Sequence, residues 1–147
     1  MLEGDRETAA ALFNRCWELL EDPVRGPEGD AELVTSAFTS RWHWCRIGAS
    51  REIAVANWMA ARALGEVGAH DLAVLFAQGA VEGADAETPD WLSASLAEGV
   101  ARAKLQRGDP DAHAALAHAD ALVADIADDD ARDLIASQLA ETRRRFA

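Results

Sequence analysis

Residues 40–48, SRWHWCRIG, hold the densest group of side chains that could do chemistry in this sequence. The segment contains two tryptophans, a histidine, two arginines and a cysteine. A helix turns by about 100° per residue, so neighbouring side chains on it point in different directions. We expect Trp44 and Cys45 to share an apolar face that faces the core, with Trp42 and His43 pointing elsewhere. The segment is therefore more typical of core residues than of a single catalytic site.

Arg41 is the exception, because it falls in the middle of that apolar face. Burying an unpaired guanidinium is very costly. We therefore expect Arg41 to have an acidic partner, and Glu98 is our first choice.

Two other predicted helices carry aromatic and charged side chains at helical spacing. Trp58 and Arg62 are four residues apart, so the ring and the guanidinium can stack. Glu98 and Arg102 are also four apart, and Trp91 lies on the same side of their helix. We expect these residues to meet on adjacent helices.

Two interpretations of this group stay open. In the first, the group is a packing and ion-pair network that stabilises alanine-rich helices. In the second, Trp58, Arg62, Glu98 and Arg102 line a groove, with Arg41, His43 or Trp44 nearby. Several arginines around one acid would suit a carboxylate, a phosphate or a peptide C-terminus.

Other chemistries have little support. His113 and His118 are five residues apart and lack the H-E-x-x-H pattern of zinc sites. No serine lies in a G-x-S-x-G turn, and no glycine-rich loop precedes a lysine as in phosphate-binding motifs. The sequence thus predicts no catalytic residue, no metal site and no cofactor.

The pattern of apolar residues predicts an all-α chain, since strand and hairpin signals are missing. Helices alternate with short stretches rich in glycine, proline and aspartate. We predict seven helices, over about 6–21, 30–47, 51–67, 69–82, 89–107 and 112–126, and from the acidic DDDARD segment to the C-terminus. Ser50 and Thr88 are the expected N-caps of the third and fifth.

An internal repeat connects the middle of the chain. ARALGEVGAHD, residues 61–71, matches ARAKLQRGDPD, residues 101–111, at a spacing of 40. In both segments the pattern ends one helix, turns at a glycine and begins the next helix. Repeats of about this length are typical of stacked helical hairpins.

These features resemble tetratricopeptide repeats. The matching positions are small residues in the first helix, a turn glycine and small residues in the second helix: Ala61 and Ala101, Gly68 and Gly108, Ala73 and Ala80. The later unit departs from the pattern at His113 and Asp120, and the spacing exceeds the usual ~34 residues. The resemblance implies one domain over residues 1–147, a right-handed stack of about three antiparallel hairpins with a C-terminal capping helix.

The chain also resembles a set of small bacterial all-helical proteins of unassigned function. The matching segments are Ser40-Arg41-Trp42-His43-Trp44, Trp58 with Arg62, and Glu98 with Ala101-Arg102-Ala103 before Gly108-Asp109. This resemblance implies a fold more than a reaction.

The net charge of −12 comes from 26 acidic and 14 basic residues. So few basic residues argue against nucleic acid or an anionic membrane surface as a partner.

Cys16 and Cys45 lack metal-type spacing, so we expect two reduced, buried thiols. No signal peptide or span of ~20 apolar residues is visible, which favours the cytoplasm.

The leading functional hypothesis is a non-enzymatic interaction module. It would bind a peptide segment, or a second copy of the chain, along its inner helical surface. The alternative is a small-molecule binding protein that holds an anionic ligand with Arg62 and Arg102, and a third hypothesis is an enzyme with a site near His43.

Overall fold

The computed structural model describes residues 2–147 and is entirely helical over that range, with seven helices and no strand. The helices are α1 (Leu2–Glu21), α2 (Pro27–Ile47), α3 (Ser50–Glu66), α4 (His70–Glu82), α5 (Asp90–Arg107), α6 (Ala112–Ala124) and α7 (Asp129–Phe146). The prediction of an all-α chain with seven helices is confirmed. Side chains are described from Gly4 onward.

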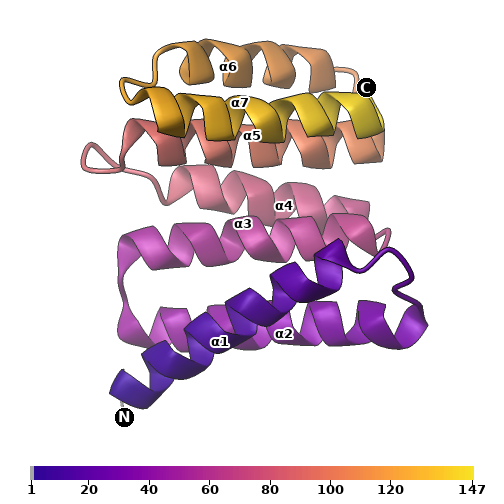
Figure 1. Cartoon of the computed structure of the whole chain (residues 1–147), viewed down its shortest axis with the longest axis vertical. Helices are drawn as coiled ribbons and strands as arrows, with labels where there is room; N and C mark the ends of the chain where they lie inside the picture. The colour runs from indigo at the N-terminus through magenta and orange to yellow at the C-terminus, as the bar shows by residue number, and fades with distance from the viewer. Residues whose placement is uncertain (1) are drawn as a thin grey trace.

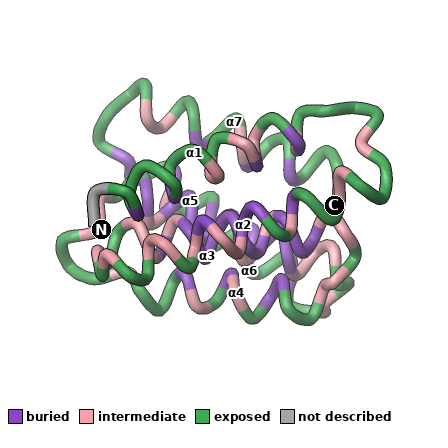
Figure 2. The backbone as a smooth tube through the Cα atoms, turned by 90° about the horizontal axis from the view of Figure 1, so that it is seen from below, coloured by how far each residue is buried: buried purple, intermediate pink, exposed green. Residues whose placement is uncertain are grey.

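Successive helices pack as hairpins, α1 with α2, α3 with α4 and α5 with α6 (Figure 1). Each hairpin contacts the next through two sets of helix pairs. The second helices α2, α4 and α6 pack on α3, α5 and α7, while the odd-numbered helices also contact one another in the order α1, α3, α5, α7. Figure 2 shows the result: α1 and α7 lie on one side of α3 and α5, and α4 and α6 lie on the other. Over the described residues α1 and α7 do not contact each other.

The helix ends follow the turn residues, with some corrections. Gly68 and Gly108, the two glycines of the repeat, have φ of 86° and 79°, a left-handed conformation that costs glycine least. α2 begins three residues earlier than predicted, at Pro27, since proline fits the first turn of a helix.

The predicted N-caps were wrong. Ala49 and Pro89 occupy the cap positions of α3 and α5. Ser50 is instead the first residue of α3, and the Thr88 hydroxyl accepts a hydrogen bond from the Asp85 amide within the preceding loop.

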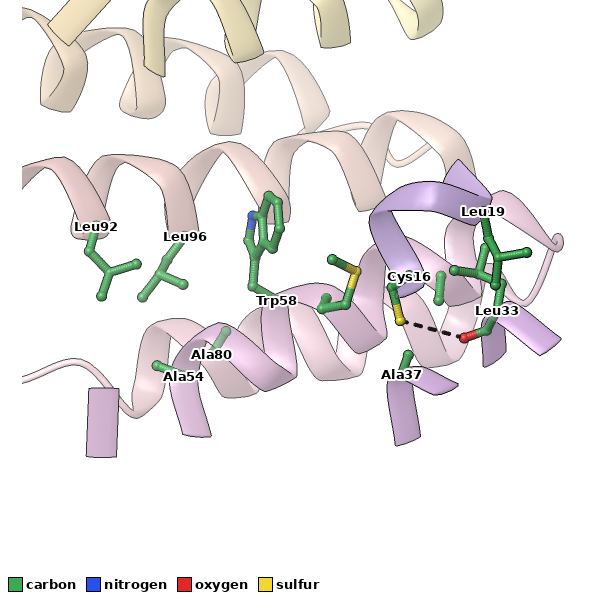
Figure 3. Close-up of a cluster of buried hydrophobic side chains, with 11 residues drawn as sticks. Cys16, Leu19, Leu33, Ala37, Ala54, Trp58, Ala80, Leu92 and Leu96 are labelled. Atoms are coloured by element: carbon green, nitrogen blue, oxygen red, sulfur yellow. Dashed lines mark hydrogen bonds between the residues drawn. The ribbon is translucent and has the colours of Figure 1, made fainter. Parts of the chain in front are cut away.

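Small residues let the helices approach closely around three apolar clusters. Alanine accounts for much of each cluster, and larger side chains fill the remaining space. Figure 3 shows the largest residue of the first cluster, Trp58, pointing from α3 toward α5, beside Leu92 and Leu96. Cys16 is buried in the same cluster and faces the Leu33 carbonyl oxygen at 3.9 Å, so the prediction for this thiol is confirmed.

The prediction that Cys45 is buried was wrong, because this thiol is exposed. The buried face of α2 passes through Leu33, Ser36, Ala37 and Ser40. At about 100° per residue, Cys45 lies roughly 130° around the helix from the middle of that face. Ser40 helps to set this orientation, because its hydroxyl donates to the Ala9 carbonyl oxygen of α1 at 2.7 Å.

Among the described helices, none combines the length and the apolar character that a membrane crossing requires.

Candidate functional site

A buried charged triad connects α5 to α7. Glu98 is 0% exposed and Arg102 is 3% exposed, and they form an ion pair one helical turn apart on α5. The Thr142 hydroxyl donates to Glu98 Oε2 at 2.8 Å and accepts from Arg102 Nε at 3.4 Å. Because both carboxylate oxygens and the guanidinium have partners, the charge of this pair is compensated inside the molecule.

Aromatic rings extend this group toward α3 and α1. The Arg102 guanidinium lies over the Trp58 ring at 5.4 Å, and the Trp17 and Trp58 rings are 5.8 Å apart. The Arg62 guanidinium lies over both rings, 5.0 Å from Trp17 and 5.7 Å from Trp58. The expectation that Trp58, Arg62, Glu98 and Arg102 meet on adjacent helices is therefore confirmed.

Arg62 differs from Arg102 in having no acidic partner. Among the side chains that the structure describes, none forms an ion pair or hydrogen bond with Arg62, and its Nε is buried without an acceptor. Burial, and secondly the positive charge of Arg102, lower the pKa of Arg62 to about 10, against an opposing effect of Glu98, Glu66 and Glu141. The guanidinium is therefore charged at neutral pH, and it contacts two aromatic rings but no described acidic side chain.

Arg62 faces a cavity of about 170 Å³ that all four odd-numbered helices line. Its lining consists of Trp17 from α1, Arg62 from α3, Arg102 from α5, and Gln138, Glu141, Thr142, Arg145 and Phe146 from α7. Typical pockets for drug-sized ligands measure about 300–1,000 Å³, so this cavity suits a smaller group. We call it the inner cavity.

Arg145, which lines the inner cavity, forms an ion pair outside the lining. Glu66, at the end of α3, pairs with Arg145 of α7 at 3.0 Å and with Arg25 of the α1–α2 loop at 3.5 Å. The Arg25 guanidinium also donates to the Leu19 carbonyl oxygen at 2.8 Å. Arg145 is thus neutralised by Glu66, as Arg102 is by Glu98.

The predicted pair of Arg41 with Glu98 was wrong. Arg41 Nε donates to Asn57 Oδ1 at 2.6 Å, and its guanidinium lies over the Phe76 ring of α4 at 5.2 Å. Arg41 thus packs between α2, α3 and α4, while Glu98 is occupied by Arg102 and Thr142. An amide acceptor and an aromatic face take the place of a carboxylate because Arg41 is only partly buried.

His43 and Trp44 also lie outside the inner cavity. His43 Nδ1 is 2.7 Å from Asp5 Oδ1 of α1, and Arg46 Nε donates to the other oxygen of Asp5 at 3.1 Å. The Trp44 ring lies under the Arg6 guanidinium at 5.3 Å. These contacts connect α1 to α2.

Trp91 lies on the same side of α5 as the triad, but toward the other end. The Ser95 hydroxyl donates to Gln138 Oε1 at 3.3 Å, which sets the register of α5 against α7. One turn earlier, the corresponding residues are Trp91 and Leu134, with exposed fractions of 39% and 60%. Trp91 and Leu134 are thus exposed apolar residues, and Trp91 lies about two helical turns before Glu98 on α5.

The sequence analysis did not single out the residues that α1 and α7 contribute. Trp17 was not among the predicted site residues, and α7 was expected only as a capping helix. A signal was present, since Leu134, Gln138, Glu141 and Arg145 recur at intervals of four, three and four residues and so share one face of α7.

Within the described part of the chain, no group of three or more histidine, cysteine, aspartate or glutamate side chains is placed to hold a metal ion. Comparisons with protein-family models, with curated proteins and with solved structures found no match.

Proposed function

We propose that this protein is a non-enzymatic binding protein that holds the carboxylate of a small ligand at Arg62. The observation that carries this proposal is the half-buried, charged guanidinium of Arg62, which faces the inner cavity without an acidic partner and whose Nε is buried without an acceptor. Arginine suits this role because its planar fork of donors matches a carboxylate. A bound carboxylate would offset the cost of burying the charge.

The fold that we propose for this role is a right-handed tetratricopeptide-type stack with α7 as its cap. The contact pattern supports it, because first helices touch successive first helices while second helices touch the next first helix. In that arrangement the odd-numbered helices form the inner surface. The inner cavity is lined by all four of them.

A second candidate is that the carboxylate belongs to the C-terminus of a peptide. The exposed pair Trp91 and Leu134 favours it, since these residues continue the inner surface beyond the cavity. Upstream residues of a peptide would cover this pair, as apolar anchors do at interfaces.

The test compares two arginine variants in a thermal-shift screen. The panel contains small carboxylic acids, free amino acids and short peptides with free or amidated C-termini. Arg62→Met removes the charge and keeps an apolar chain against the tryptophan rings. Arg144→Met is the matched control, because Arg144 is an exposed α7 residue outside the cavity.

We expect at least one carboxylate compound to raise the melting temperature of the wild type and of Arg144→Met, but not of Arg62→Met. A saturating ligand at about 100 times its Kd would add about 2.7 kcal/mol of stability. The proposal fails if no carboxylate stabilises the wild type at 10 mM, or if every stabilising compound acts equally on Arg62→Met.

A further inference from the structure

The inner cavity contains a second unpaired charge, of opposite sign to Arg62. Glu141 of α7 lines the cavity, and among the described residues it forms no ion pair or hydrogen bond. The other two arginines of the lining, Arg102 and Arg145, are already neutralised by Glu98 and Glu66. One free guanidinium and one free carboxylate therefore remain for a ligand.

Arg62 and Glu141 lie within electrostatic range of each other without forming an ion pair at 4.0 Å or less. They are on different helices, α3 and α7, and the cavity lies against both. A ligand that carried only a negative charge would gain from Arg62 and be repelled by Glu141. A ligand with separated positive and negative groups would gain from both.

The charge of the whole molecule points the same way. A net charge of −12 repels an approaching anion, whereas a ligand with no net charge approaches without that penalty. The remaining lining includes the rings of Trp17 and Phe146, which offer apolar contact to the uncharged part of a ligand.

Building on the proposed function, we infer that the ligand is a zwitterion of the amino-acid class, with its carboxylate at Arg62 and its ammonium group at Glu141. The class includes α-amino acids and those with one or two further carbon atoms between the charges. The size of the cavity, about 170 Å³, fits a free amino acid better than a larger metabolite.

The experiment measures dissociation constants by calorimetric titration with matched probes. They are the free amino acids with uncharged side chains and their β and γ isomers. For each binding amino acid we add the acid that lacks the amino group and the amine that lacks the carboxylate; for L-leucine these are 4-methylpentanoate and 3-methylbutylamine. A charge-assisted hydrogen bond contributes about one order of magnitude in affinity. The amino acid should therefore bind about tenfold more tightly than the acid without the amino group or the amine without the carboxylate.

Glu141→Gln separates this inference from the proposed function. Glu141 is exposed, so the variant should fold. We expect it to weaken binding of the amino acid about tenfold and to leave binding of the deaminated acid equal or tighter. Asp133→Asn, which removes an exposed carboxylate of α7 outside the cavity, should change neither affinity.

The inference is overturned if no amino acid binds, if the deaminated acid binds as tightly as the amino acid, or if Glu141→Gln leaves amino-acid binding unchanged. In those cases a carboxylate or a peptide that binds the wild type but not Arg62→Met would still support the proposed function. Ligands that bind equally to Arg62→Met would overturn both.

Discussion

Thr142 is the residue that completes the buried ion pair of α5. Its hydroxyl both donates to Glu98 and accepts from Arg102, and Glu98 is 0% exposed. A buried carboxylate oxygen that loses its donor keeps its desolvation cost without compensation. The triad is therefore a structural element of the site. Arg62, which lies outside the triad, is the residue that is free to bind a ligand.

Thr142→Val tests the role of this hydroxyl, because valine has a similar shape and no donor. We expect the free energy of unfolding to fall by about 1–3 kcal/mol, measured by urea denaturation. Thr35→Val, at an exposed position of α2, should change it by less than about 0.5 kcal/mol. Equal stability of Thr142→Val and the wild type would contradict the role of the triad.

Asp5 predicts a pH dependence at the junction of α1 and α2. Its pKa is lowered mainly by the hydrogen bond with His43, against an opposing effect of burial, and further by Arg46. A carboxyl whose pKa is lowered on folding adds stability above its unfolded pKa of about 3.9, and loses it as the pH falls through the folded value. The melting temperature of the wild type should exceed that of Asp5→Asn above about pH 4, and the gap should close at lower pH.

Asp133→Asn is the control for that measurement, since Asp133 is an exposed residue of α7. Because Asp133 has no described hydrogen bond or ion pair, the Asp133→Asn variant should show the same change in melting temperature with pH as the wild type. A gap between the wild type and Asp5→Asn that did not narrow as the pH fell below about 4 would contradict the assignment, because the carboxylate that His43 and Arg46 stabilise is then being protonated.

At the scale of helices, Gly99 sets how closely α3 and α5 pack. A Cβ at this position would lie 2.7 Å from Cδ1 of the Trp58 ring, which has apolar neighbours on its other side. The absence of a side chain at Gly99 thus makes room for the tryptophan that Arg62 and Arg102 contact.

Gly99→Ala should destabilise the protein by about 1–3 kcal/mol, because the ring must shift in a packed core. The helix propensity of alanine alone would have the opposite effect and would raise the free energy of unfolding by about 1 kcal/mol. The control is Gly65→Ala in α3, where the nearest atoms belong to the Gln106 side chain and can move away. Thermal unfolding that showed Gly99→Ala equal to or more stable than Gly65→Ala would contradict this packing.

The sequence could predict the packing of some helices but not the orientation of others. The repeat placed α3 and α5 side by side, and with them the meeting of Trp58, Arg62, Glu98 and Arg102, because residues 40 positions apart fall on equivalent faces. The orientation of α2 could not be predicted in this way, since its buried face includes two serines, Ser36 and Ser40, that an apolar pattern does not select. The partners of Arg41 depend on that orientation, which is why Glu98 was the wrong choice.

The contribution of α7 was also beyond sequence reasoning. Thr142, Gln138 and Glu141 are ordinary polar residues of an amphipathic helix, and only the packing of α7 on α5 brings them to the cavity. The spacing along one helix predicts which residues share a face, but not which neighbour that face meets.

At the scale of the molecule, the four odd-numbered helices surround one uncompensated cation inside a strongly acidic protein. Nearly every other buried or half-buried charge described in the site has an internal partner, as Arg102 has Glu98 and Arg145 has Glu66. Arg41 also lacks an acidic partner, but its Nε donates to Asn57, whereas the buried Nε of Arg62 has no acceptor among the described residues. A buried donor without an acceptor lowers stability. Our central claim is that Arg62 is kept for a ligand.

The most direct test of this claim is the stability of Arg62→Met in dialysed, ligand-free protein, measured against the wild type by urea denaturation at low salt. If the charge serves binding, its removal should leave the free energy of unfolding equal or higher, because methionine fills the space against Trp17 and Trp58 without a desolvation cost. If Arg62 instead serves packing through its contacts with both rings, the variant should lose more than about 1 kcal/mol, and that loss would contradict our account.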